Sequence, residues 1–204
     1  MSEKNINLIK AGFFILCCLP LLRLIWAATY EHLGANPLEF ITRNTGDWAL
    51  YFLLGTLVIT PLRKLMGWSW LIKLRRMLGL FAFFYAACHF LCFIWFDHFF
   101  EWSEMWRDVI KRPFITIGFI AFLLLLPLAF TSTNAMIKRV GAKRWQRIHQ
   151  LIYVIALLGI LHYFWMKAGK QDFAQPILYA SVLSILLGVR VFWFWQKRRT
   201  QISS

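Results

Sequence analysis

The sequence predicts an all-α integral membrane protein, folded as a bundle of six transmembrane helices with both ends of the chain in the cytoplasm. Hydrophobic residues make up 60% of the 204 residues, well above the share of about half that soluble domains carry. The apolar residues form long blocks, and the positive charge lies in the short stretches between them. The net charge of +14 therefore indicates basic membrane loops, and no nucleic-acid partner is expected.

Six apolar segments are long enough, or nearly so, to cross the hydrocarbon core, which takes about 20 helical residues. They cover roughly residues 8–28, 46–62, 77–97, 113–130, 147–166 and 176–195. Tryptophans, which favour the membrane interface, lie near their ends. These are Trp26, Trp48, Trp68, Trp70, Trp95, Trp102, Trp145, Trp165, Trp193 and Trp195. No soluble domain, long linker or obvious internal repeat is seen, so residues 1–204 are predicted to form one transmembrane domain.

The charges between successive segments predict the orientation of each helix in turn. With the N-terminus inside, the inner segments hold most of the bases: Lys4, Lys10, Arg63, Lys64, Lys73, Arg75, Arg76, Lys138, Arg139, Lys143, Arg144, Arg147, Arg190, Lys197, Arg198 and Arg199. The outer segments hold Arg43, Arg107, Lys111, Arg112, Lys167 and Lys170. Among the acids, only Glu3 is inside. The positive-inside rule therefore predicts a multi-pass protein with both termini in the cytoplasm.

Two histidines lie deep in the third and fifth segments. His89 follows Arg76 by 13 residues, or roughly 20 Å of helix, and His162 follows Arg147 by 15 residues, or roughly 22 Å. Both imidazoles are therefore expected at one level, in the outer half of the membrane. Two imidazoles on separate membrane helices are what a low-spin haem needs as axial ligands.

Small residues accompany each of these histidines. Ala86 and Gly159 precede His89 and His162 by three residues, which places each on the same helical face as its histidine. Such a face leaves space for a flat macrocycle, although small residues also serve close helix packing. Membrane histidines can also hydrogen-bond a neighbouring helix, which is the alternative to ligation.

A third histidine, His149, lies at the inner edge of the fifth segment. It is 13 residues from His162, or roughly 20 Å along the axis, a distance that suits a second haem. The two histidines are about 140° apart around an ideal helix, however, and the third segment has Arg75 and Arg76 at that level. A second haem would need a non-histidine ligand, a shared ligand or a distorted helix. The remaining histidines, His32 and His98, are expected to be solvated.

Several arginines are candidates for the propionates of a haem, because guanidinium groups pair with carboxylates. Arg23, within the first segment, and Arg43 would serve the outer level, although Arg23 can instead extend to the membrane surface. Arg75, Arg76, Arg144 and Arg147 would serve an inner cofactor, although orientation and lipid headgroups also explain them.

The source of electrons must lie outside this chain. It has no dinucleotide-binding glycine motif and no P-loop, so reducing equivalents come from a quinol, a bound flavin or a separate reductase. No Cys-x-x-Cys-His occurs, which excludes a c-type haem.

Three segments resemble the MsrQ family, formerly YedZ. They are RNTGDWALYFLLGTLVITPLRKL, RRMLGLFAFFYAACHF and TSTNAMIKRVGAKRWQRIHQLIYVIALLGILHYFW. The resemblance covers about residues 8–197, and its most specific part is the Trp-Gln-Arg-x-His turn followed by a second histidine 13 residues on. Members are haem-binding membrane subunits of bacterial methionine sulfoxide reductase systems, related to ferric reductase and NADPH oxidase transmembrane domains.

This resemblance implies a b-type haem, one or two, and an FMN, for which the basic loop 131–147 is a candidate place. It implies the bacterial inner membrane and a periplasmic molybdopterin-containing catalytic subunit, which reduces methionine sulfoxide. Electrons would come from the quinone pool or a cytoplasmic flavin reductase. His89, His149 and His162 match the haem-linked histidines of the family. The wider ferric reductase pattern has two histidines on each of two helices, and this chain lacks one.

Two other functions stay open at the level of sequence. A cofactor-free transporter or assembly factor would use the histidines as interhelical hydrogen-bonding groups, although no broken helix or paired intramembrane charge indicates a transport site. A stand-alone haem-dependent ferric or quinone reductase would share the same helix bundle.

Overall fold

The computed structural model describes residues 2–202, and every regular element within them is helical. The long helices are α1 (Glu3–Thr29), α2 (Pro37–Met66), α3 (Ile72–Cys92), α5 (Pro113–Phe130), α8 (Leu151–Ala168) and α9 (Ala174–Ile202). Shorter elements connect them: a 3-10 turn (Ser69–Leu71), a π-helical turn (Phe93–Asp97), α4 (Trp102–Lys111), α6 (Asn134–Val140) and α7 (Ala142–His149).

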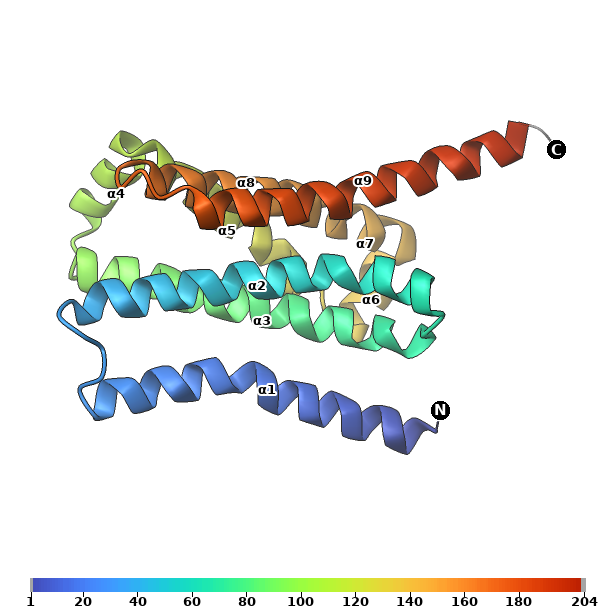
Figure 1. The fold of residues 1–204 in the computed structure, drawn as a ribbon, viewed down its shortest axis with the longest axis horizontal. Coiled ribbons are helices and arrows are strands. Elements are labelled where there is room, and N and C mark those ends of the chain that lie inside the picture. Colours follow the sequence, from blue (N-terminus) through green and yellow to red (C-terminus); the bar gives the residue numbers. More distant parts are fainter. Residues whose placement is uncertain (1, 203–204) are drawn as a thin grey trace.

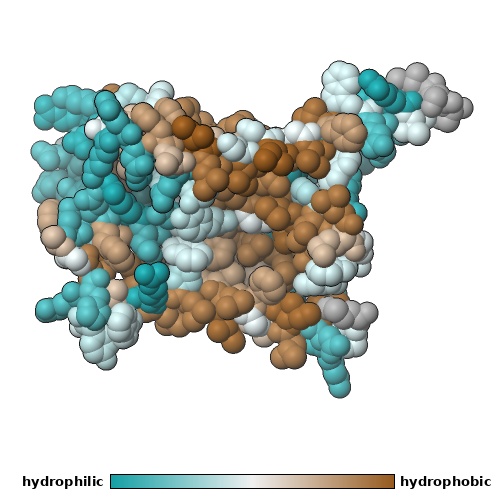
Figure 2. Space-filling view, viewed as in Figure 1, coloured by the Kyte–Doolittle hydropathy of each residue, from teal (hydrophilic) through white to brown (hydrophobic). Residues whose placement is uncertain are grey.

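Six helical segments of the described chain are long and apolar enough to cross a membrane. They are Glu3–Thr29, Pro37–Met66, Ser69–Asp97, Pro113–Phe130, Ala142–Ala168 and Ala174–Gln201. The predicted all-α, six-span fold is therefore confirmed. Both ends of the chain lie at the same end of the bundle (Figure 1), as an even number of spans requires. Polar residues gather at the two ends, and an apolar band lies between them (Figure 2).

Helix α2 begins nine residues before the apolar segment that predicted it. The Asn36 side chain accepts a hydrogen bond from the Glu39 backbone N–H at 3.2 Å, and Pro37 occupies the first turn. These residues start the helix outside the apolar block. Hydropathy marks the part of a helix that lies in lipid and does not mark its capped end, which explains the difference.

Two helix pairs form the centre of the bundle. The most extensive contacts join α2 to α3 and α5 to α8, while α9 packs on α8 and α2. Leu57, Leu74, Tyr85 and Ile155 are almost fully buried between them. This paired arrangement places α3 and α8, the helices of the two deep histidines, inside the bundle.

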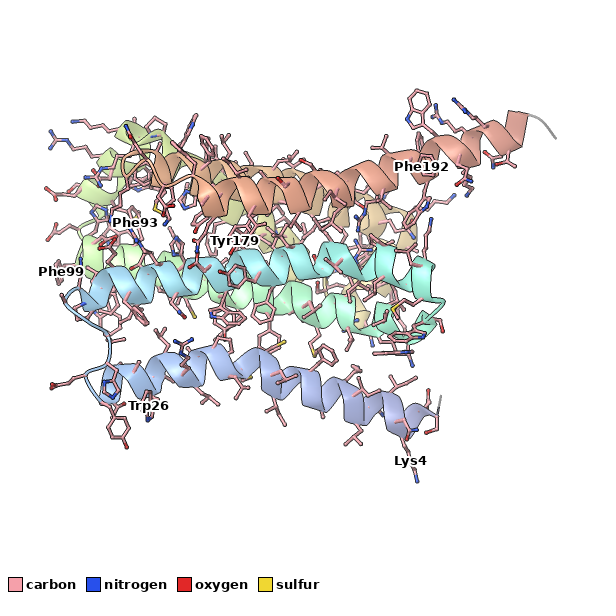
Figure 3. The ribbon with its side chains drawn as sticks, in the orientation of Figure 1. Lys4, Trp26, Phe93, Phe99, Tyr179 and Phe192 are labelled. Carbon is pink, nitrogen blue, oxygen red and sulfur yellow. The ribbon has the colours of Figure 1, made fainter. Side chains whose placement is uncertain are left out.

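Helix α1 packs at the edge of the bundle, and its Lys4 and Trp26 point away from it (Figure 3). Tyr85 of α3 joins it to the core. The Tyr85 hydroxyl donates to the Cys17 carbonyl at 2.9 Å and accepts from the Leu21 N–H at 3.1 Å. These two backbone groups would bond each other in a regular helix, so the hydroxyl is inserted into the hydrogen-bond ladder of α1 beside Pro20.

Candidate metal centre between two helix pairs

The two deep histidines face each other across the bundle. His89 of α3 and His162 of α8 have ring centroids 6.1 Å apart, and their ring planes cross at 76°. The two rings thus lie at one level, as their depths along the helices predict. Both residues are only partly exposed.

Each imidazole is held by a backbone carbonyl of the neighbouring helix. His89 Nδ1 lies 2.8 Å from the Thr42 carbonyl oxygen of α2, and His162 Nδ1 lies 2.6 Å from the Phe114 carbonyl oxygen of α5. A carbonyl only accepts hydrogen bonds, so each Nδ1 carries the proton. The lone pair is then on Nε2, which is the arrangement of a histidine that is oriented for metal binding.

A glycine lies against each of these rings. A Cβ built on Gly46 would be 3.1 Å from His89 Nδ1, and one built on Gly118 would be 2.7 Å from His162 Nδ1. Gly46 and Gly118 follow the two carbonyl residues by four positions, one turn further along the same helices. Sequence reasoning missed both glycines, because their partners lie on helices far away in the chain.

The histidines line a cavity of about 750 Å³ between the two helix pairs. Its middle is mainly apolar, with Leu50, Leu53, Ala82, Phe122, Leu125 and Ile155 in the wall. Ala86 and Gly159 also line it, so the small residues predicted beside the histidines do face the same space. The volume and the apolar wall are typical of a site for a cofactor-sized ligand.

The end of this cavity that is remote from the chain termini is polar. It is lined by two arginines, Arg43 and Arg112, by His98 and by four carboxylates, Glu39, Asp47, Asp97 and Asp108. Arg112 Nε lies 3.4 Å from Asp108 Oδ2. Phe93, which also lines the cavity, points into the space between the helix layers in Figure 3. The cavity therefore combines an apolar middle with cationic and acidic groups at one end.

The expectation that His98 is solvated is wrong. The residue is only 8% exposed, and its ring packs edge-on against Phe93 with centroids 4.5 Å apart. Its Nε2 is 3.6 Å from Asp108 Oδ2, too far for a hydrogen bond, and has no hydrogen-bond partner among the described residues. Asp108 of α4 lies beside the ring, a neighbour that hydropathy alone did not show.

Comparisons with known proteins agree with this architecture. Residues 45–160, more than half of the chain, match the model of the ferric reductase like transmembrane component. A protein-methionine-sulfoxide reductase heme-binding subunit MsrQ from Herminiimonas arsenicoxydans is 65% identical over 97% of this chain and 90% of its own length. Proteins of the same name from Ralstonia nicotianae (51% identical, covering 98% of this chain and 92% of that protein) and Bordetella pertussis (50%, 97% and 96%) are also similar.

This chain belongs to the MsrQ family. The family assignment predicted from the three segments is thus confirmed, as is the relation to the ferric reductase transmembrane domains.

The third histidine of this MsrQ-family chain has a different setting. His149 ends α7, its Nε2 lies 3.1 Å from Thr131 Oγ1, and its ring centroid is 4.0 Å from that of Trp145. It is not in the wall of the large cavity. Within the fifth span, Gln150 alone separates α7 from α8, and it keeps right-handed helical torsion angles of φ −72° and ψ −20°. Ala142–Ala168 therefore still forms one span, with a local tight turn in which the Tyr153 N–H bonds the Gln150 carbonyl at 3.1 Å.

The predicted arginines fall into three groups. Arg43 lines the large cavity and forms an ion pair with Glu39. Arg23 lines a separate, smaller cavity with Trp26 and His32. The four inner arginines, Arg75, Arg76, Arg144 and Arg147, do not line the large cavity, and Arg76 donates to Asn134 Oδ1 at 2.5 Å. Arg112, at the outer end of the cavity, was not predicted.

Proposed function

We propose that this chain is a haem-binding membrane subunit that transfers electrons within a protein-methionine-sulfoxide reductase system. One observation carries the proposal: His89 and His162 face each other with proton-bearing Nδ1 atoms, so that both Nε2 lone pairs are free for one metal ion. The names of the similar proteins support the same conclusion, because each is called a heme-binding subunit.

The geometry fits a metal held between the two rings. Metal–imidazole bonds are about 2 Å long and each ring centre lies about 1 Å beyond its nitrogen, so two axial rings have centres roughly 6 Å apart. The observed separation of 6.1 Å agrees with this value. The apolar middle of the cavity fits the porphyrin ring, and a b-type haem bound there would carry one electron at a time as its iron changes between the ferric and ferrous states.

The polar end of the cavity fits the propionates of a haem. Arg43 and Arg112, which now pair with Glu39 and Asp108, would turn to the propionate carboxylates. Nε2 of buried His98, which has no hydrogen-bond partner among the described residues, would gain one. We place the propionates at this outer end for these reasons. Arg23 is less suited, because it lines the separate cavity.

A second haem, if this chain binds one, would use His149 at the inner edge. Its Nε2 would have to leave Thr131 Oγ1, and Arg75 is half-buried at the same inner end of the bundle. A second candidate ligand on α3 is not evident among the described residues.

The electron path that we propose runs outward across the bacterial inner membrane. The inner side would receive electrons from the quinone pool or a cytoplasmic flavin reductase, with an FMN near the basic loop 131–147. The outer side would deliver them to a periplasmic molybdopterin-containing subunit, which reduces methionine sulfoxide. The charge distribution supports cytoplasmic termini and hence this direction.

The test is a haem count per polypeptide, by pyridine haemochrome, on protein purified in detergent from haem-replete cells. We expect a bis-imidazole spectrum in the native protein and loss of that haem in His89→Ala and in His162→Ala. His32→Ala, at an exposed position, is the matched control. A haem-free native preparation would favour a transporter or assembly factor. Rapid reduction of ferric chelates without any partner would favour a stand-alone reductase.

A further inference from the structure

The α2–α3 pair and the α5–α8 pair hold their histidines in the same way. In α2 and α3, the Thr42 carbonyl bonds His89, and Gly46 lies against the ring. In α5 and α8, the Phe114 carbonyl bonds His162, and Gly118 lies against that ring. The glycine-to-histidine spacing is 43 residues in one pair and 44 in the other. The bundle thus contains a structural repeat that the sequence did not reveal.

Among the glycines of the described residues, only Gly46 and Gly118 lie against a histidine ring. A methyl group on Gly118 would lie 2.7 Å from His162 Nδ1, which real side chains do not tolerate, and one on Gly46 would lie 3.1 Å from His89 Nδ1. Gly55, elsewhere on α2, would meet only Leu78 at 3.9 Å, and Gly188 of α9 would meet nothing within 4 Å. The missing side chains at positions 46 and 118 are therefore what allows each ring to reach its carbonyl.

A carbonyl and a glycine together restrict how each ring can turn. The hydrogen bond fixes the direction of the Nδ1–H, and the helix backbone at the glycine limits the approach of the ring. The outcome is a pair of ring planes that cross at 76°. We infer that Gly46 and Gly118 are positioning residues that hold the two axial imidazoles crosswise on one haem iron. This inference rests on the function proposed above.

Crossed ligands have a consequence for the electronic structure of the iron. Parallel imidazole planes overlap with one of two iron d orbitals and separate their energies, whereas crossed planes interact with both orbitals almost equally. Ferric low-spin haem with crossed ligands therefore gives a highly anisotropic EPR spectrum with one very large g value. Parallel ligands give a rhombic spectrum with three well-resolved g values. Axial-ligand orientation is thus measurable apart from any activity.

The experiment is low-temperature EPR of the ferric, detergent-purified protein carrying His149→Ala, which removes the only candidate histidine of an inner haem. We expect the highly anisotropic signal in this background. Adding Gly118→Ala should displace His162 and convert the signal toward the rhombic type or release the haem. Gly46→Ala should act in the same direction but less, because its contact is longer. Gly55→Ala on α2 is the matched control and should leave the signal unchanged.

Three results would contradict either this inference or the proposed function, and they can be told apart. A full haem complement with a rhombic signal in the unsubstituted glycine background would overturn the crosswise arrangement while leaving the proposed function intact. A full complement and an unchanged signal in Gly118→Ala would overturn the positioning role. A protein without haem in the background itself would contradict the proposed function instead.

Discussion

His89 and His162 differ from His149 and His98 in the hydrogen bonds of their rings. Both deep histidines bond a backbone carbonyl through Nδ1, whereas His149 bonds the Thr131 hydroxyl through Nε2. His98 Nε2 has no hydrogen-bond partner among the described residues. Backbone carbonyls cannot change their role as acceptors, so these two rings keep one tautomer. This is the reason why we place the axial ligands at residues 89 and 162 and leave His98 to the propionate end.

Arg43 and Arg112 allow a test of the propionate end. Arg43→Gln and Arg112→Gln should each weaken haem retention, because each removes a charged partner of a propionate. The two side chains are 35% and 57% exposed, so solvent screening limits each contribution to about 1 kcal/mol. That energy corresponds to roughly five-fold in affinity. Haem transfer from the detergent-solubilised protein to excess apomyoglobin measures the loss.

The control for these arginine variants is Arg107→Gln on the exposed face of α4. It should retain haem as the native protein does. Equal retention in all three variants would place the propionates elsewhere, and Arg23→Gln would then be the next variant to measure.

One hydroxyl adds hydrogen bonds to the apolar contacts that hold α1 on the bundle. Tyr85→Phe would leave the Leu21 N–H and the Cys17 carbonyl without their partner at an apolar depth. Unsatisfied buried groups cost about 1–3 kcal/mol each, so we expect a lower Tm in detergent. Tyr30→Phe, at the exposed end of α1, removes a similar hydroxyl and should leave Tm unchanged. An equal Tm for Tyr85→Phe and the native protein would show that the Leu21 N–H and the Cys17 carbonyl can bond each other when the hydroxyl is absent.

The connection between α8 and α9 predicts a pH dependence. The buried Lys167 ammonium donates to Asp172 Oδ2 at 2.6 Å and lowers the pKa of that carboxyl. A lowered folded-state pKa stabilises the protein above the unfolded pKa of about 4, and this contribution disappears as the pH falls through the folded-state value.

Asp172→Asn should therefore lower Tm at pH 7, where the Lys167 charge loses its partner. The difference from the native protein should shrink as the pH falls below about 4. Thermal unfolding in detergent between pH 7 and 3 measures it, with Glu104→Gln on α4 as the exposed control. A difference that stays constant with pH would contradict the role of this ion pair.

For the whole molecule, the orientation in the membrane is open to direct measurement. We expect green fluorescent protein fused after residue 202 to fluoresce, because it folds on the cytoplasmic side. Alkaline phosphatase fused after Lys170, in the outer α8–α9 connection, should be active. The reverse pair of results would place the termini outside and would reverse the proposed direction of electron flow.

The helical class, the number of spans and the level of the deep histidines could all be predicted from the amino-acid sequence. These follow from local properties: apolar length, the alternation of charge and a fixed rise per residue. His89 and His162 are at matching depths because of their positions along two helices, and no other information is needed to see this. The family could also be recognised, because its motifs are continuous in the chain.

The groups that surround the histidines could not be predicted from the sequence, because packing between helices brings them together. The Thr42 and Phe114 carbonyls, the two glycines and Arg112 belong to other helices, and no periodicity connects residues 46 and 89. Backbone carbonyls carry no sequence signal at all. The burial of His98 is likewise a result of packing. The ligands are thus visible in the chain, while their orientation arises from contacts between helices that are distant in sequence.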